Sequence, residues 1–249
     1  MTYQAVLFDM DGVVVDSERS VTEFWQDLAR LEGYSLSGDD LEQHVYGRRA
    51  EHTLAELFPQ ISADRYDEVY ARLKQNQQSL RYSAITGATT LLRHLRAADV
   101  PLALVTGAQP WKVTEVLGQL ELTEIFQVLV NAEDVAAGKP DPAGYLLAAQ
   151  RLAVPIGRCL VFEDAVSGVT SAVTAGATCV AVARPHRSAQ VLHAGATTVV
   201  RDFEGVAFAV RERTLHINST VEFSFSSTQN RRSSTAVGDY WCDFVSPLS

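Results

Sequence analysis

Short apolar runs that alternate with helical patterns restrict the fold of this 249-residue chain more than any other feature of its sequence. The runs cover Ala5 to Phe8, Pro101 to Thr106, Phe126 to Asn131, Cys159 to Glu163 and Thr178 to Ala183. Strands that are apolar on both sides are typical of parallel sheets covered by helices on both faces. The alternation therefore predicts an α/β protein with an open, mostly parallel sheet, whose ligands bind at the carboxyl ends of the strands.

The segments between these runs have helical periods. One apolar helical face contains Val113, Val116, Leu117 and Leu120, and another contains Tyr145, Leu146, Ala149 and Leu152. The second segment is preceded by Asp141 as a cap and Pro142 in the first turn, a combination typical of helix starts. Helices are thus expected after the second and the third apolar run.

Residues 18–84 interrupt the alternation, because they carry helical periods and no convincing strand. This insertion directly follows the first strand, so it should cover the carboxyl edge of the sheet. We therefore predict a Rossmann-like core of residues 1–17 and 85–215, and a small all-helical cap domain of residues 18–84. Trp25 lies in the apolar stripe of the first cap helix and is assigned to the interior of the cap.

The last 34 residues change in character. Residues 216–249 contain eight serines and scattered aromatic residues without a helical period. We predict that they form a tail, disordered or loosely attached to the rest of the chain. The alternation of Val221, Phe223 and Phe225 allows one short strand within it.

Composition and charge exclude several classes of partner. Thirty acidic against 21 basic residues give a net charge of −9, so no broad basic surface is available to a phosphate backbone, and nucleic acid is not an expected partner. The apolar runs are too short to cross a membrane, and no basic residue precedes the first of them as in a signal peptide. Cys159, Cys179 and Cys242 show no pairing pattern and should be free thiols. We expect a cytoplasmic monomer.

Two pairs of acidic residues stand at the ends of apolar runs. Asp9 and Asp11 follow the first run, spaced so that an extended backbone directs both carboxylates to one side, and Gly12 lets the chain turn sharply. Glu163 and Asp164 stand at the end of the fourth run. Carboxylates from two strands that meet at one sheet edge repel each other unless a cation lies between them, and an all-oxygen site suits Mg²⁺. The sequence therefore predicts a Mg²⁺ site at this edge.

Polar residues also follow the second and third runs. Thr106 ends the second run with Gly107 beside it, which offers a hydroxyl and an open backbone N–H, and Lys139 lies in the turn-rich segment GKPDP. Each has an ordinary structural explanation, Thr106 as a helix cap and Lys139 as a solvated lysine. Combined with a metal, however, a hydroxyl, an amide and an ammonium group are the donors of a phosphate-binding site.

The motifs DxDGV, a strand ending in Thr, GKPDP and FEDAxxG, in this order, resemble those of the haloacid dehalogenase superfamily of phosphotransferases. The resemblance covers about residues 1–213. The helical insertion directly after Asp16 resembles the β-phosphoglucomutase-like, sugar-phosphatase branch. The resemblance implies a Mg²⁺-dependent phosphatase that acts on small phosphorylated metabolites, with sugar phosphates as the best class.

The resemblance also implies roles for the four acidic residues. Asp9 would be the nucleophile that forms an aspartyl-phosphate. Asp11 would be the general acid and then the general base, and its backbone carbonyl would ligate the metal. Asp164 would be a metal ligand, with Glu163 among the ligands or just behind them.

In the same family pattern, Thr106, the Gly107 amide and Lys139 would hold the oxygens of the transferred phosphoryl group. Gly107 departs from the small polar residue that often follows this threonine in the family. Only the backbone amide, and no side chain, is therefore available at this position.

Substrate recognition is expected in the cap. Arg48 and Arg49 follow Gly47 and precede a helical stretch, and an arginine there could bind the far end of a phosphorylated substrate. Arg49 is our first choice, although it could also be a solvated partner of Glu51. Weaker candidates in the cap are Glu18, Lys74, His44 and His52.

Two other functions stay open. Mutases of this branch resemble a D-T-A-x-x-H pattern after the catalytic loop, and Val21 stands where this pattern has its histidine. Valine cannot transfer a proton, which favours a phosphatase over a β-phosphoglucomutase-type mutase. The second alternative is a non-catalytic binding or regulatory protein of the same fold, and the retained, mutually repelling carboxylates of the two acidic pairs argue against it.

Overall fold

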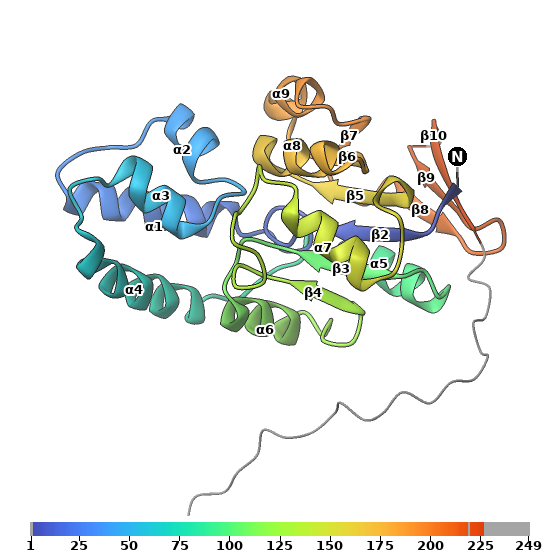
Figure 1. Cartoon of the computed structure of the whole chain (residues 1–249), viewed down its shortest axis with the longest axis horizontal. Helices are drawn as coiled ribbons and strands as arrows, with labels where there is room; N and C mark the ends of the chain where they lie inside the picture. Colours follow the sequence, from blue (N-terminus) through green and yellow to red (C-terminus); the bar gives the residue numbers. More distant parts are fainter. Residues whose placement is uncertain (1, 219, 227–249) are drawn as a thin grey trace, which may run out of the picture.

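The computed structural model describes residues 2–218 and 220–226. Its larger sheet is parallel, as predicted, with six strands in the order β4-β3-β2-β5-β6-β7 (Figure 1). The strands are β2 (Ala5–Phe8), β3 (Leu102–Val105), β4 (Val128–Val130), β5 (Cys159–Glu163), β6 (Thr178–Val182) and β7 (Thr198–Val200). The first five lie within the predicted apolar runs. From β2 the chain adds β3 and β4 on one side, and from β5 it adds β6 and β7 on the other side, so the strand order reverses between β2 and β5. Ligands bind at such a reversal, and the carboxyl ends of β2 and β5 therefore form the expected ligand-binding edge.

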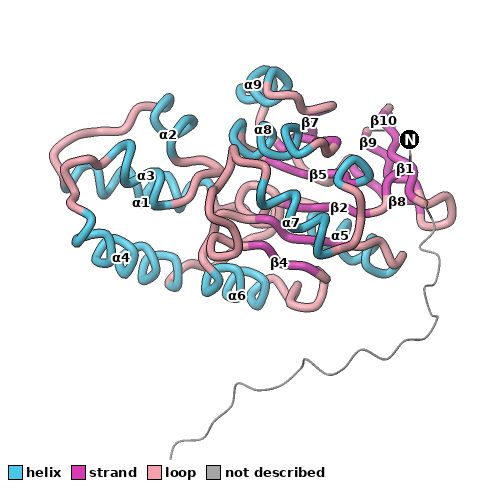
Figure 2. Tube along the Cα trace, in the orientation of Figure 1, coloured by secondary structure: helices cyan, strands magenta, loops and turns pink. Residues whose placement is uncertain are grey.

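Helices cover both faces of this sheet (Figure 2). Helices α5 (Ala88–Ala97) and α6 (Pro110–Gln119) pack on one face, and α7 (Ala143–Arg151), α8 (Val166–Ala175) and α9 (Ser188–His193) on the other. One part of the predicted face of α7 is wrong: Leu146 is 43% exposed. Ala148, together with Tyr145, is buried against the sheet instead.

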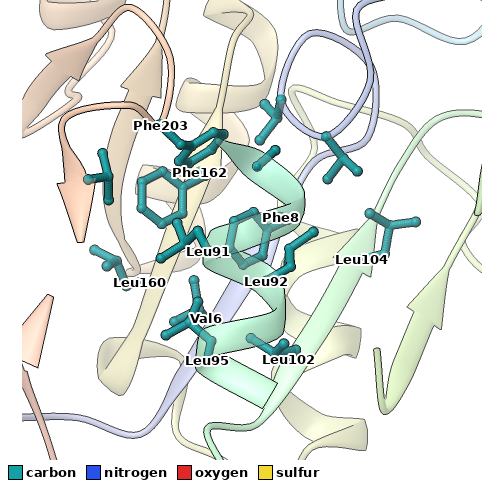
Figure 3. Packing of buried hydrophobic residues seen from close by; sticks show 14 of the residues in the cluster. Val6, Phe8, Leu91, Leu92, Leu95, Leu102, Leu104, Leu160, Phe162 and Phe203 are labelled. Carbon is teal, nitrogen blue, oxygen red and sulfur yellow. The ribbon is translucent and has the colours of Figure 1, made fainter. Parts of the chain in front are cut away.

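The largest hydrophobic cluster lies between the sheet and α5 (Figure 3). Leu91, Leu92 and Leu95 repeat along one face of the helix and are buried against the sheet. Beneath them, the rings of Phe8 and Phe162 stack with their centroids 5.1 Å apart. This packing fixes β2 against β5, and thereby the relative positions of the residues at their carboxyl ends.

The insertion between β2 and α5 is helical. It contains α1 (Glu18–Leu31), α2 (Gly38–His44), α3 (Ala50–Leu57) and α4 (Tyr66–Gln78), and residues 18–84 contain no strand. These helices enclose a hydrophobic cluster of their own, in which Trp25 is 4% exposed. Figure 1 shows α1 to α4 beyond the end of the parallel sheet, on the side opposite β8 to β10. The segment therefore lies where a cap over the site is expected.

The carboxyl-terminal segment differs from the prediction. Strands β8 (Val206–Ala209), β9 (Thr214–Ile217) and β10 (Val221–Phe225) form an antiparallel meander, and β1 (Thr2–Tyr3) pairs in parallel with β10. The prediction of a tail beginning at residue 216 is thus wrong for the described part of this segment. The short strand that the alternation of Val221, Phe223 and Phe225 indicates is present as β10. The physical reason is burial: Leu215, Ile217, Phe223 and Phe225 pack into the main hydrophobic cluster. Residues 227–249 lie outside the described residues.

Two smaller expectations can be compared with the structure. Among the described residues, no helix combines the length and the apolar character that crossing a bilayer requires. Cys159 and Cys179 are buried free thiols, as predicted, and Cys242 lies outside the described residues.

Candidate active site

The neighbouring ends of β2 and β5 bring three carboxylates together. One oxygen from each of Asp9, Glu163 and Asp164 lies within 4.8 Å of the other two. Oδ1 of Asp164 is buried and has no hydrogen-bond partner among the described residues. A buried, unpaired carboxylate oxygen is costly unless a cation or donor occupies the site. Three carboxylate oxygens at this spacing, one of them unpaired, suit a hard cation, so the residues present fit the metal that the sequence implies.

Two glycines allow the chain to approach these carboxylates closely. Gly12 has a φ of +75°, which is favourable only for glycine, and a Cβ at this position would lie 2.1 Å from Oδ2 of Asp164. A Cβ at Gly168 would lie 2.0 Å from the carboxylate of Glu163. The glycines of the DxDGV and FEDAxxG motifs are thus required by close packing around the acidic residues.

Lys139 neutralises part of the cluster. Its ammonium group is in contact with Oδ1 of Asp9 and Oε1 of Glu163, and it donates to the Val105 carbonyl at 3.2 Å. Its side chain is only 7% exposed, so Lys139 is not a solvated surface lysine. The hydroxyl of Tyr145 also donates to Oε1 of Glu163, at 2.7 Å. Sequence analysis missed this tyrosine, whose place in the buried face of α7 gave no polar signal.

Glu163 is engaged by the protein on both oxygens. Besides the contacts to Oε1, the backbone N–H of Asp164 donates to Oε2 at 3.0 Å. The side chain of Asp164, by contrast, carries the free oxygen. Of the two residues, Asp164 is therefore better suited to direct coordination, and Glu163 to holding Lys139.

Burial dominates the protonation equilibria of the cluster. It raises the pKa of Asp9 to about 7, against the opposing attraction of Lys139, while Glu163 and Asp11 add to the rise. Burial, with the nearby Asp9, also holds the pKa of Asp164 well above its usual range. A cation among these groups favours their ionised forms and opposes both shifts.

Asp11 has different partners from the three clustered carboxylates. Its Oδ1 accepts a hydrogen bond from Ser17 Oγ and another, of 2.7 Å, from the ammonium group of Lys112 in α6. Lys112 was not among the predicted site residues. A signal existed, because Lys112 lies four residues before Val116 and so on the buried side of α6, an unusual place for a lysine.

Thr106 and Gly107 lie at the carboxyl end of β3, where they were expected. Thr106 is 6% exposed, and its Oγ1 accepts from the backbone N–H of Ala108 at 3.1 Å. The hydroxyl therefore organises the turn, and both residues also line the cavity next to the carboxylates. The explanation of Thr106 as a helix cap is wrong, because Gln109 caps the following helix, α6.

A cavity of about 380 Å³ lies between the core and the helical insertion. Its core wall includes Asp9, Asp11, Thr106, Gly107, Trp111, Lys112 and Asp164. Its cap wall includes Glu18, Val21, Trp25, Tyr46, Arg48, Glu51, Tyr70, Lys74 and Gln77. Three predicted cap candidates, Arg48, Glu18 and Lys74, are thus on the wall, whereas Arg49, His44 and His52 are not among the described residues that line it. The volume suits a small metabolite.

Arg48 and Arg49 bind backbone carbonyls of the core. Arg49 donates to the carbonyl of Val135 at 2.8 Å and to that of Ala136 at 3.4 Å, in the loop between β4 and α7. Arg48 donates to the carbonyl of Lys139 at 3.0 Å. The first-choice recognition residue, Arg49, therefore connects the cap to the core in this structure and is not among the described residues that line the cavity.

A second connection between the cap and the core involves Arg187, which sequence analysis also missed. Its guanidinium donates to Glu18 at 3.0 Å and to Glu42, and it lies over the ring of Tyr46 with 4.3 Å to the centroid. Although Arg187 belongs to the loop after β6, all three partners lie in the cap. The two groups of arginine contacts connect the cap to different loops of the core.

The sequence and the fold can be compared with known proteins. The chain matches the haloacid dehalogenase-like hydrolase family over residues 3–176. It is 33% identical over 190 residues to validoxylamine A 7'-phosphate phosphatase of Streptomyces hygroscopicus subsp. limoneus, covering 74% of this chain and 87% of the relative. It is 34% identical over 189 residues to hexitol phosphatase A of Escherichia coli, covering 74% and 85% of the two chains. Among solved structures, a putative β-phosphoglucomutase from Thermotoga maritima has a TM-score of 0.62 at 30% identity, covering 79% and 94%.

The parallel sheet with its acidic strand ends defines a hydrolase of the haloacid dehalogenase type. The chain belongs to the haloacid dehalogenase-like hydrolase family, as its motifs predict. Like the phosphatases to which it is similar, the chain is a phosphoric monoester hydrolase, which confirms the predicted class of enzyme.

Proposed function

We propose that this enzyme is a Mg²⁺-dependent phosphatase that hydrolyses small sugar or polyol phosphates through an aspartyl-phosphate on Asp9. The observation that carries the proposal is the cluster of Asp9, Glu163 and Asp164, of which Asp9 and Asp164 line a cavity of about 380 Å³. The relatives support the substrate class, since one is a hexitol phosphatase and another acts on validoxylamine A 7'-phosphate. The alternating charged and aromatic groups on the cap wall suit a hydroxyl-rich leaving group.

The residues present fit a divalent cation. Asp9 and Asp164 would hold it through their carboxylates, Asp11 through its backbone carbonyl, and Glu163 would support them from behind. When bound, the cation would neutralise charge on the nucleophile and on the phosphoryl group.

The chemistry of the chain itself follows from the positions of Asp9 and Asp11. An oxygen of the Asp9 carboxylate forms a bond to phosphorus, the bond from phosphorus to the leaving oxygen breaks, and this oxygen takes a proton from Asp11. The Asp11 carboxylate then removes a proton from a water molecule that attacks phosphorus and releases Asp9. Thr106, the Gly107 amide and Lys139 would hold the remaining phosphoryl oxygens in both steps.

The two alternatives make different demands on the cavity. A mutase must protect the phosphorylated enzyme from water until the sugar has reoriented in the cavity. Val21, at the position of the mutase histidine, contributes only an apolar side chain to the cavity wall. A binding protein has no need for buried carboxylates with raised pKa values, because each costs stability. Both considerations favour the phosphatase.

A substrate panel tests this proposal. Phosphate release is measured from phosphorylated sugars, polyols, glycolate and nucleoside monophosphates, with Mg²⁺ and with a chelator, and glucose 1-phosphate is followed in parallel for conversion to glucose 6-phosphate. We expect Mg²⁺-dependent release from a few sugar or polyol phosphates. Isomerisation without release would identify a mutase, and no reaction on any member of the panel would favour the binding protein.

Mg²⁺ should stabilise the fold more strongly in alkaline than in acidic solution. The pKa of Asp9 is raised from 3.8 to about 7 in the folded state. Between pH 3.8 and about pH 7, Asp9 is therefore protonated in the folded state and ionised in the unfolded state. The contribution of Asp9 to stability is thus greatest below pH 3.8 and is lost as the pH rises through 7. Protons and Mg²⁺ compete for this carboxylate, so saturating Mg²⁺ should raise Tm by roughly 5 °C at about pH 8 and by much less at about pH 5.5.

Thermal denaturation with MgCl₂ measures this difference, and NaCl at equal ionic strength is the control. The Asp164→Asn variant should lose most of the shift, because it replaces the charged carboxylate with a neutral amide. A shift of equal size at both pH values, or one that survives in Asp164→Asn, would place the cation elsewhere.

Arg49→Ala should raise the KM of the enzyme for all substrates by a similar factor. The substitution removes two hydrogen bonds between the cap and the loop at residues 135–136, which should raise KM by roughly 3- to 10-fold. Kinetics on a preferred sugar phosphate and on p-nitrophenyl phosphate measure the effect. A loss confined to the sugar phosphate would instead make Arg49 the recognition residue that the sequence suggested.

A further inference from the structure

We propose that Lys112 is a positioning residue for Asp11: it holds one oxygen of this carboxylate so that the other faces the leaving group. The inference rests on the proposed function, because it assigns the way in which the general acid of that reaction is oriented. None of the sequence motifs includes Lys112, which lies 101 residues from Asp11 along the chain.

The first observation is the burial of Lys112. Its side chain is 8% exposed, and among the described residues its ion-pair partner is Asp11 alone, with 2.7 Å between Nζ and Oδ1. Burying an ammonium group is costly unless it is paired, and lysines are seldom found on the buried side of a helix. Lys112 lines the catalytic cavity and is paired with Asp11, which indicates that the contact with Asp11 determines its position.

The second observation is the pattern of contacts on the carboxylate. Lys112 Nζ and Ser17 Oγ both donate to Oδ1, and the side-chain hydrogen bonds to Asp11 in the described part of the chain reach this oxygen only. Two donors from different elements, α6 and the start of α1, fix the plane of the carboxylate. Oδ2 is left free, and since Asp11 lines the cavity, Oδ2 is the oxygen available to a ligand.

The chemistry assigns different tasks to the two oxygens. Oδ2 carries the proton and gives it to the leaving oxygen as the bond from that oxygen to phosphorus breaks. The electron pair of the O–H bond stays on Asp11, which becomes a carboxylate, and the adjacent ammonium group of Lys112 stabilises the charge that develops. In hydrolysis of the phosphorylated enzyme, Oδ2 accepts a proton from the attacking water. Lys112 remains on Oδ1 throughout and does not touch the substrate.

Leaving groups of graded basicity test this proposal. Lys112→Met keeps the length and the apolar part of the side chain and removes the ammonium group. A basic alkoxide leaving group requires protonation, whereas p-nitrophenolate requires little. For a sugar or polyol phosphate that the wild type hydrolyses, kcat should fall by roughly 10- to 100-fold, and for p-nitrophenyl phosphate by less than about 3-fold. Across a series of substituted phenyl phosphates, the loss should grow with the basicity of the phenol.

Two further variants distinguish positioning from a purely structural role. Lys112→Arg keeps a charged donor and should recover part of the lost rate on the alkyl phosphate. In an Asp11→Asn background, Lys112→Met should cause almost no additional loss, because the residue it positions can no longer transfer a proton. Circular dichroism and Tm identify any variant that fails to fold, and Lys112→Gln then replaces Lys112→Met in the series.

The outcomes separate this proposal from the proposed function. Equal losses on alkyl and aryl phosphates, no loss on either, or additive effects of Lys112→Met and Asp11→Asn would each overturn the role of Lys112, while the phosphatase would stand. If the wild type released phosphate from no substrate, the proposed function itself would fail.

Discussion

Replacing Asp9 with Asn is expected to abolish phosphate release while the protein stays folded. The variant keeps the shape of the side chain but removes the carboxylate that would attack phosphorus, so kcat should fall by at least roughly 10⁴-fold. Asp9 lies at the carboxyl end of β2 and not within a hydrophobic cluster, and Lys139 retains Glu163 as a partner. The loss should therefore be one of chemistry, and Tm should change by only a few degrees.

Phosphate release from the preferred substrate, with Tm measured on the same preparation, checks this expectation. The matched control is Asp39→Asn, which removes an exposed carboxylate from α2 in the cap, far along the chain from the cluster, and should retain wild-type activity. Activity of Asp9→Asn above the level of a contaminating phosphatase would refute Asp9 as the nucleophile. Loss of folding would show that Asp9 is structural.

The parts of the fold that the sequence predicted are those with a local signal. Each buried strand of the parallel sheet is apolar on both sides, and each of β2, β3 and β5 ends in polar residues, so the edge that carries the site was visible before the structure. Parallel pairing then places Asp9 beside Glu163 and close to Asp164, although Asp9 is far from both in the sequence. Strands of the small second sheet were harder to predict, because β9 ends in, and β10 lies within, the serine-rich segment that begins at residue 216.

What the sequence could not provide are contacts that depend on the packing of the cap against the core. The choice between Arg48 and Arg49 illustrates this: the two are adjacent, and only the cavity wall distinguishes them. Arg187 is likewise an ordinary basic residue in its local context, and the place of Lys112 on the buried side of α6 does not show which residue it contacts. Their partners, Glu18 and Asp11, come from segments more than 100 residues away, and no local periodicity reports such a pairing.

The second large effect is expected from Lys139, whose replacement should reduce stability as well as activity. Lys139→Met leaves Asp9 and Glu163 buried beside each other without the ammonium group that joins them. Removal of one partner from a buried ionic cluster costs about 3–5 kcal/mol, which corresponds to a decrease in Tm of roughly 10 °C for a chain of this size. Urea denaturation of the wild type and of the variant under the same conditions measures this loss. Mg²⁺ should restore part of it, because a cation can replace some of the missing positive charge.

A second substitution shows whether repulsion between the carboxylates causes the loss. Glu163→Gln, added to Lys139→Met, removes one of the two uncompensated charges, so the double variant should be more stable than Lys139→Met alone. Lys74→Met provides the control for the loss of a lysine, since Lys74 is exposed and its replacement should change the free energy of unfolding by less than about 0.5 kcal/mol. If the double variant is less stable than Lys139→Met, the ammonium group serves mainly to fill space. In that case the balance of charge around Asp9 must come from the bound cation and not from the chain.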